Sequence, residues 1–411
     1  MFKHHILALF ILLLSLGFAV SAEERPLVGA IRWDAWYGMI PDEGLRAATS
    51  WPGANPESKA SPNPGAEAQR NLKPERFEYR RPFFSTMDEK GNLVEIDGNR
   101  QEVMDQEIDY AVRAGLDFWA FTVYPEDCPL SLCFQKFISS PKKDQMKFCF
   151  FLVCASAYGR FADDPAIREY VLRYVTDPSY LKVQGNRPVF YVGFLNPEID
   201  AKLKNGVWAE FCEKVQAKGL GKPYVVTDHG SSPEFLKNYV AEMGFDAVGR
   251  YCQTDSTAEN APFAQLAERA EAWAKSCKDA GLNVSPICMT GWDRRPRFIS
   301  PTSWELWHKP GEFMERFYQS GTPEEIADHI GRSVDFLRKF PNADDVNLVL
   351  IYAWNECDEG GWIIPTQILG TARIDALSKK LKEQNNSPTQ KDEILPHVPF
   401  HFRSGRSFGA D

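Results

Sequence analysis

Eight short apolar segments alternate with helical segments along this chain, and that alternation constrains the fold more than any other feature. The expected strands are 27–37, 116–124, 146–155, 187–195, 223–227, 246–251, 283–289 and 346–353. Segments with helical character separate most of them: 101–114, which Gly115 ends, and 163–175, 199–217, 233–243, 262–280 and 323–339. A last helix, 368–382, is expected after the eighth strand. Eight strands alternating with helices predict an α/β fold, a (β/α)8 TIM barrel. The segment 40–98 is too long for a simple connection, so we expect a long first βα loop that forms a lid or cleft wall.

The first residues are typical of an export signal. A weakly basic start and an apolar stretch, 6–20, lead to small residues that end at Ala22. The stretch is shorter than the ~20 apolar residues of a membrane span. We therefore expect three parts: a signal peptide at 1–22, a catalytic barrel at 23–383 and a C-terminal tail at 384–411. The protein is expected to be exported, to the periplasm or the extracellular space, with no stable membrane association.

Charge and cysteine usage exclude several classes of partner. The net charge of −9 argues against nucleic acid, because phosphate binding needs a basic surface. Nine cysteines show no zinc-binding spacing, so we expect no metal and no cofactor. Cys128 and Cys133 flank a short loop and either form a disulfide or stay free. No glycine-rich phosphate loop follows the last two strands, so a nucleotide or phosphosugar substrate is not indicated.

The eighth expected strand ends in a cluster of acids and indoles. Trp354, Asn355 and Glu356 follow its apolar run, with Glu359 and Trp362 close behind. Barrels build active sites at such strand ends. Burying acids near indoles costs free energy unless the acids are paired or perturbed. Carboxylates for proton transfer beside flat apolar faces suit sugar chemistry, so we predict Glu356 and Glu359 as the catalytic pair. The alternative is a solvated turn at the end of the strand.

Aromatic and charged residues also end the other strands, and a barrel would gather them at one face. The first strand ends in residues that form either a sugar-binding floor or an aromatic core around one capped aspartate: Trp33, Asp34, Trp36 and Tyr37. The further substrate-binding candidates are Tyr124, Tyr158, Asp228, His229, Tyr251, Trp292, Asp293, Arg295, Trp354, Asn355 and Trp362. The cluster of Arg294, Arg295 and Arg297 either holds an acidic or sulfated group or pairs with neighbouring acids.

Several of these segments resemble a known group of proteins. Asn355-Glu356 followed by Glu359-Gly360 is similar to the Asn-Glu-x-x-Glu-Gly signature of glycoside hydrolase family 99 and the WbsX-like proteins of the family 99-like group. Gly291-Trp292-Asp293, with Arg295 and Arg297 after it, resembles a segment of WbsX-like proteins. Segments 79–84 and 103–121 are also similar to this group, so the resemblance runs through most of the chain.

The resemblance implies a (β/α)8 barrel that hydrolyses α-linked glycans, such as α-mannosides or related polysaccharides, with net retention. In family 99 the first glutamate deprotonates the sugar 2-hydroxyl and the second protonates the leaving oxygen, through an epoxide-like intermediate. Carried over, Glu356 would be the base and Glu359 the acid. Cys357 stands where the family usually has tryptophan, and Asp358 adds a charge beside the pair. We expect an exported glycoside hydrolase with an oligo- or polysaccharide substrate. The alternatives are a WbsX-like glycosyltransferase-type protein and a non-catalytic glycan-binding barrel.

Overall fold

The computed structural model describes residues 25–40, 63–155, 160–254, 258–305 and 307–386. Residues Arg25–Asn385 form one compact unit. The expected signal peptide, the part of the long loop at 41–62, Tyr158 and the chain beyond 386 lie outside the described residues. In the described part of the chain, no helix combines the length and the apolar character that crossing a membrane requires.

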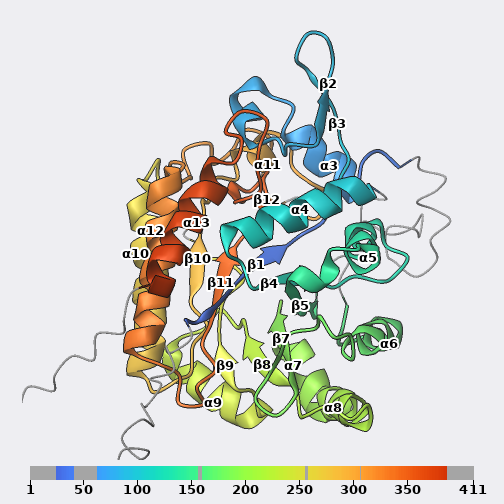
Figure 1. The fold of residues 1–411 in the computed structure, drawn as a ribbon, viewed down its shortest axis with the longest axis vertical. Helices are drawn as coiled ribbons and strands as arrows, with labels where there is room; N and C mark the ends of the chain where they lie inside the picture. The colour runs from blue at the N-terminus through green and yellow to red at the C-terminus, as the bar shows by residue number, and fades with distance from the viewer. Residues whose placement is uncertain (1–24, 41–62, 156–159, 255–257, 306, 387–411) are drawn as a thin grey trace, which may run out of the picture. The chain divides into compact units, whose positions relative to one another are not determined.

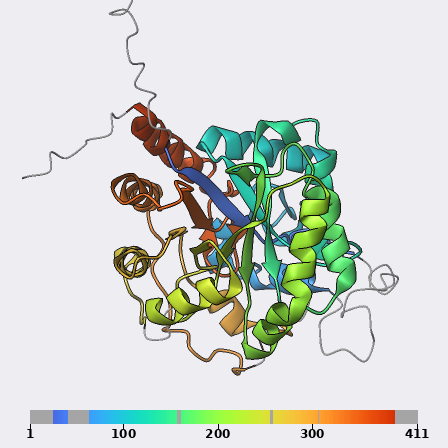
Figure 2. The same cartoon turned by 90° about the horizontal axis from the view of Figure 1, so that it is seen from below.

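Eight parallel strands form the centre of this unit (Figures 1 and 2). They follow the spatial order β10-β11-β1-β4-β5-β7-β8-β9. A parallel bridge between Val248 and Val284 joins the two ends of this order and closes the barrel. The predicted (β/α)8 barrel is therefore confirmed. The strands are β1 (Leu27–Arg32), β4 (Phe118–Thr122), β5 (Lys147–Val153), β7 (Arg187–Gly193), β8 (Tyr224–Thr227), β9 (Ala247–Val248), β10 (Ile287–Met289) and β11 (Leu348–Tyr352).

Helices surround the strands, as Figure 2 shows. They are α4 (Gln101–Ala114), α5 (Leu132–Ser139), α6 (Pro165–Tyr174), α7 (Pro197–Lys202), α8 (Trp208–Ala217), α9 (Pro233–Met243), α10 (Phe263–Asp279), α11 (Arg295–Ile299), α12 (Pro323–Lys339) and α13 (Ala372–Asn386). Local signals set their ends: Gly115 closes α4 with φ +87°, and Thr322 forms a capping box with Glu325 at the start of α12. One helix expected over 199–217 is instead α7 and α8, because the backbone at Gly206 (φ +114°) is not helical.

The described part of the expected long loop has structure of its own. It contains α3 (Pro64–Asn71), a 3₁₀ turn (Glu75–Arg80) and a hairpin of β2 (Ser85–Met87) with β3 (Leu93–Ile96). The side chain of Asn63 caps α3 by accepting from the N–H of Ala66. An antiparallel bridge from Pro82 to Thr366 ties this segment to the chain that follows β11.

A second small hairpin carries the predicted catalytic pair. Strand β12 (Asn355–Glu356) pairs with β13 (Gly361–Trp362), and the four residues between them form its turn. Gly360 has φ +88°, a conformation that favours glycine. A Cβ on Gly361 would lie 2.3 Å from the ring of Tyr352. The two glycines thus let the hairpin fold tightly against the end of β11.

Candidate active site

A pocket of about 410 Å³ opens at the carboxyl ends of the barrel strands. Its lining residues end a barrel strand or come after one, which is where barrel enzymes bind substrate. They are Trp33, Tyr124, Val153, Phe194, Tyr251, Cys252, Trp292, Arg297, Trp304, Glu305, Glu356 and Glu359. The structure therefore places both predicted catalytic glutamates in one pocket with aromatic side chains around them.

Glu356 is buried, with 3% of its surface exposed. Its Oε1 accepts a hydrogen bond of 2.6 Å from the hydroxyl of Tyr251. Its Oε2 has no hydrogen-bond donor among the described residues and lies 3.6 Å from Nη2 of Arg297. Burial raises the pKa of Glu356 well above its ordinary value, and the nearby charge of Glu359 raises it further, although Arg297 opposes the shift. The protonated form of Glu356 is therefore favoured.

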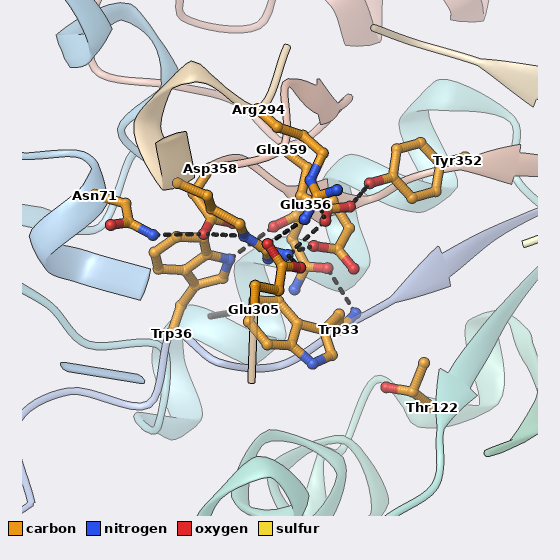
Figure 3. Close-up of polar contacts among 12 residues, drawn as sticks. Trp33, Trp36, Asn71, Thr122, Arg294, Glu305, Tyr352, Glu356, Asp358 and Glu359 are labelled. Carbon is orange, nitrogen blue, oxygen red and sulfur yellow. Dashed lines mark hydrogen bonds and ion pairs between the residues drawn. The ribbon is translucent and has the colours of Figure 1, made fainter. Parts of the chain in front are cut away.

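Glu359 lies on the hairpin turn and is held by two cations and a phenol (Figure 3). The hydroxyl of Tyr352 donates to Oε2, and the guanidinium of Arg297 donates to Oε1. Nε of Arg294 lies 3.3 Å from the same Oε1. Since Arg297 also lies against Glu356, one guanidinium contacts both members of the pair.

Arg297 is the centre of a group of buried and half-buried charges that we call the pocket cluster: Arg294, Arg297, Glu305, Glu356, Asp358 and Glu359. Arg297 pairs with Asp358 through two hydrogen bonds, of 2.7 and 3.1 Å, and with Glu305 at 3.0 Å. Burial lowers the pKa of Arg297, but the surrounding carboxylates raise it more, so that the net shift is upward. Asp358 is fully buried and also accepts from Asn71 at 3.2 Å. The charge added by Asp358 is thus neutralised by Arg297.

The three arginines of the predicted cluster all pair with acids of this chain. Arg294 pairs with Glu305 and Glu359, as does Arg297. Arg295 donates two hydrogen bonds of 2.8 Å to Asp293. Of the two alternatives for these arginines, the structure shows salt bridges to neighbouring acids.

A second group of buried polar residues, which we call the sealed network, lies behind the pocket wall: Arg32, Asp34, Glu107, Trp354 and Asn355. Arg32 pairs with Asp34 at 2.8 Å and with Glu107 at 3.1 Å. Nε1 of Trp354 donates to Glu107 at 2.8 Å, and the side-chain amide of Asn355 donates to Asp34 at 2.9 Å. None of these five residues lines the pocket. The prediction that Asp34, Trp354 and Asn355 bind substrate directly is not supported by their positions, because their polar groups face one another.

Among the other predicted binding residues, four line the pocket: Trp33, Tyr124, Tyr251 and Trp292. Trp36 instead donates from Nε1 to the backbone oxygen of Asn355 at 2.7 Å, and the hydroxyl of Tyr37 accepts from the N–H of Gly65 at 2.8 Å. The ring of Trp362 is covered by Arg373, whose guanidinium carbon lies 3.7 Å from the ring centroid. These aromatic residues pack inside the protein because their rings are almost fully buried.

Three charged candidates also lie off the pocket lining. Asp293 pairs with Arg80 and Arg295. His229 lies 3.4 Å from Asp200 and packs beside the ring of Tyr239. Burial raises the pKa of Asp228 to about 6, against the lowering effects of the Tyr251 backbone and of Arg250. Tyr158 lies outside the described residues.

The pocket also contains residues that the sequence did not indicate. Trp304 and Glu305 come from an irregular segment after β10, where no periodic pattern marks them. Phe194 follows β7, so its strand-end position was the available signal. The long segment at 63–98, expected as a lid or cleft wall, contributes no residue to the pocket lining.

Other expectations concern metals and disulfides. All nine cysteines lie in the described part of the chain and none is in a disulfide, including Cys128 and Cys133. Burial raises the pKa of both these thiols, which disfavours the reactive thiolate. Within the described ranges there is no grouping of three or more acidic, histidine or cysteine side chains that could hold a metal ion.

The fold and the pocket define a (β/α)8 barrel whose strand ends hold a buried pair of glutamates. The chain belongs to the family described as "Glycosyltransferase WbsX", whose model matches residues 151–377, more than half of the sequence. The predicted resemblance to WbsX-like proteins is thereby confirmed.

Two curated relatives share the name "Uncharacterized protein WxcX" and come from two strains of Xanthomonas campestris pv. campestris, B100 and ATCC 33913. Each is 26% identical over 243 residues, which cover 56% of this chain and 31% of the relative. The chain thus spans about a third of the length of the curated relatives it matches.

Solved structures with a similar chain trace include the GH99 endo-alpha-mannosidase from Bacteroides thetaiotaomicron, with a TM-score of 0.49 and 13% identity over 88% of this chain and 98% of that one. A second is titled "Glycoside hydrolase-like protein", with a TM-score of 0.47 and 13% identity over 87% of this chain and 94% of that one. Similarity at this level implies neither a shared activity nor a shared substrate.

Proposed function

We propose that this protein is an exported glycoside hydrolase that cleaves α-linked glycans with retention, using Glu356 and Glu359 as its acid–base pair. One observation carries the proposal: two buried glutamates, three residues apart on one hairpin, line the same aromatic pocket and contact the same guanidinium, Arg297. Carboxylates that transfer protons beside rings that stack on sugars are what glycoside cleavage needs.

The electrostatics of the pair support this chemistry. Burial and the charge of Glu359 raise the pKa of Glu356, so the pair retains a proton to higher pH than an isolated carboxyl group would. A pair that shares one proton contains one acid and one base at the same time. Tyr251 and Tyr352 each hold one of the two carboxyl groups in place.

The proposed reaction follows the scheme that the family resemblance implies. Glu359 gives its proton to the glycosidic oxygen as the bond from that oxygen to C1 breaks. Glu356 takes the proton of the sugar 2-hydroxyl, whose oxygen bonds to C1. Water then bonds to C1 as the bond from the 2-oxygen to C1 breaks, Glu359 takes the proton of the water, and Glu356 returns its proton to the 2-oxygen. Because the ligand-free site favours the proton on Glu356, the proposal includes its transfer to Glu359 when substrate binds.

A second function, transfer from a nucleotide sugar, is favoured by the description of the WbsX family as glycosyltransferases. The charges of the pocket argue against it. Glu305, Glu356 and Glu359 line the pocket with Arg297, whose guanidinium already pairs with them. Such a lining repels the diphosphate of a nucleotide sugar. Export supports hydrolysis too, because nucleotide-sugar donors are cytoplasmic. We propose export from the composition of residues 1–22, and cell fractionation of the native protein tests it.

The deciding experiment is a hydrolysis screen of the protein on α-mannan, α-glucan and acidic or sulfated glycans. Glu356→Gln and Glu359→Gln keep the side-chain shape but remove the titrating group, so each is expected to lower turnover by roughly 10²-fold or more. Glu312→Gln, at an exposed position on the segment that carries Glu305, is the matched control and should keep full activity.

The other outcomes separate the alternatives. Full hydrolysis by Glu359→Gln contradicts the acid–base assignment. Sugar transfer from a nucleotide donor, with no hydrolysis of any glycan, identifies a transferase. Binding of one glycan without turnover, unchanged in both glutamine variants, identifies a non-catalytic glycan-binding barrel.

A further inference from the structure

Phe194 combines two features that are unusual for a phenylalanine. Its backbone has φ +57°, in the left-handed region that bulky side chains rarely adopt. Its side chain is 40% exposed although it lines the pocket. A strained conformation that leaves an apolar ring in water stabilises neither the backbone nor the core. Strained residues tend to be retained where they serve function.

The surroundings of Phe194 explain why the chain turns at this residue. A Cβ on the preceding Gly193 would lie 2.6 Å from the ring of Phe151, so the end of β7 packs tightly against β5. The left-handed backbone conformation therefore occurs one residue later, at Phe194. Its ring meets Tyr251 edge-on, with 5.3 Å between ring centroids and 65° between planes. Tyr251 in turn donates its hydroxyl to Glu356. A sugar ring lying on Phe194 would thus be next to one of the two glutamates.

A different aromatic wall accompanies the other glutamate. Trp33 and Trp304 meet edge-on with 6.1 Å between ring centroids. The guanidinium carbon of Arg297, which pairs with Glu359, lies 5.2 Å from the ring of Trp33. Strands β4 and β5 separate the strand of Trp33 (β1) from that of Phe194 (β7). The pocket therefore has aromatic side chains from two strands that are not neighbours in the barrel, β1 and β7.

We infer that Phe194 is a platform on which one sugar unit of the substrate stacks, while Trp33 and Trp304 hold a unit on the other side of the cleaved bond. This inference deepens the proposed function, on which it rests. It specifies that the ligand is an oligo- or polysaccharide that occupies the pocket on both sides of the glutamate pair.

The test measures binding separately from chemistry, by calorimetry on Glu359→Gln protein with short α-linked manno-oligosaccharides. Adding Phe194→Gly is expected to raise Kd roughly tenfold, the loss expected from one apolar ring face. Glycine tolerates the left-handed backbone, so the Tm is not expected to fall. Phe194→Tyr restores the ring and should restore the affinity. Phe340→Ala removes an equally exposed ring (46%) at the end of α12 and should change neither quantity.

Each result decides something. An unchanged Kd after Phe194→Gly overturns the inference, and the proposed function then stands or falls on the hydrolysis screen alone. If Phe194→Gly lowers both the Tm and the affinity, and Phe194→Tyr does not restore the affinity, the inference is also overturned. The ring of Phe194 then has a structural role. The expected loss of affinity in a protein that hydrolyses no glycan supports the platform and contradicts the hydrolase proposal. If the Glu359→Gln protein that keeps Phe194 binds none of these oligosaccharides, the inference is overturned.

Discussion

The sealed network and the pocket cluster contain similar residues at similar depth, yet their hydrogen bonding differs. Both are built from arginines and carboxylates close to the end of β11. None of the polar side-chain atoms of the sealed network is both buried and without a hydrogen bond, whereas Oε2 of Glu356 in the pocket cluster is. Buried polar groups are normally satisfied, so the exceptions call for a functional explanation.

This comparison distinguishes residues that support the fold at the strand-end face of the barrel from residues that can take part in chemistry there. In the sealed network every polar side chain is hydrogen-bonded to another member, which fixes the hairpin that carries the pair. Burial raises the pKa of Glu107 there, as it raises that of Glu356, so the raised pKa does not separate the two groups. What separates them is that an oxygen of Glu356 remains available to a ligand in the pocket. Perturbed groups in a pocket are where acid–base chemistry is expected. The following predictions test whether the two groups differ in this way.

The largest effect is expected from Arg32→Met in the sealed network. The variant leaves Asp34 and Glu107 buried without their cation, and breaking such a pair costs about 3–5 kcal/mol. Urea denaturation should show this loss in the free energy of unfolding. Adding Asp34→Asn and Glu107→Gln removes the unpaired charges and should recover part of it. A loss below about 1 kcal/mol for Arg32→Met alone would mean that the network contributes little to the fold.

A smaller effect, with a defined pH dependence, is expected from Glu356→Gln in the pocket cluster. The pKa of Glu356 is raised in the folded protein, so its contribution to stability is fully present below its ordinary value near 4.5 and is lost as pH rises through the folded value. Glutamine does not titrate. The variant should therefore match the parent in stability below about pH 4.5 and become the more stable of the two as the pH rises above that value.

Thermal unfolding of the two proteins across this pH range measures the difference. The same measurement on Glu312→Gln, a surface glutamate, serves as the control and should show no such divergence. If Glu356→Gln is less stable than the parent at every pH, its carboxylate is stabilised by Arg297 more than burial opposes it. The carboxylate of Glu356 would then stabilise the fold as the charges of the sealed network do, and the proposed difference between the two groups would be wrong.

The fold could be predicted because barrel strands are buried on both faces and form apolar runs, while surface helices show a 3.6-residue period. The bounds of α4, α9 and α12 were predicted correctly, since a glycine, a capping serine and a capping box mark their ends. Helix α5 (Leu132–Ser139) was missed because eight residues are too few to show a clear period.

The site could be predicted only in part. The glutamate pair follows a continuous apolar strand, so its place in the pocket was accessible from the sequence. Asn355 could have been assigned to the interior, because neighbouring residues of a strand point to opposite sides and Glu356 faces the pocket. Trp304 and Glu305 reach the pocket through an irregular segment, and no sequence pattern encodes such a long-range contact.

The smallest effect is expected from His229→Gln, which tests whether the pocket includes the end of β8. His229 follows β8 at the same barrel face, but its ring packs against Phe235 and Tyr239 and lies beside Asp200 instead of in the pocket. Glutamine keeps a hydrogen-bonding side chain there, so stability should change by about 0.5 kcal/mol or less. Turnover by His229→Gln on the substrate found in the hydrolysis screen should stay within about twofold of that of the unsubstituted protein. The comparison variant is Tyr251→Phe, which removes a hydroxyl bonded to Glu356. A loss for His229→Gln as large as that for Tyr251→Phe would place His229 in contact with bound substrate, and the pocket would then extend over the end of β8.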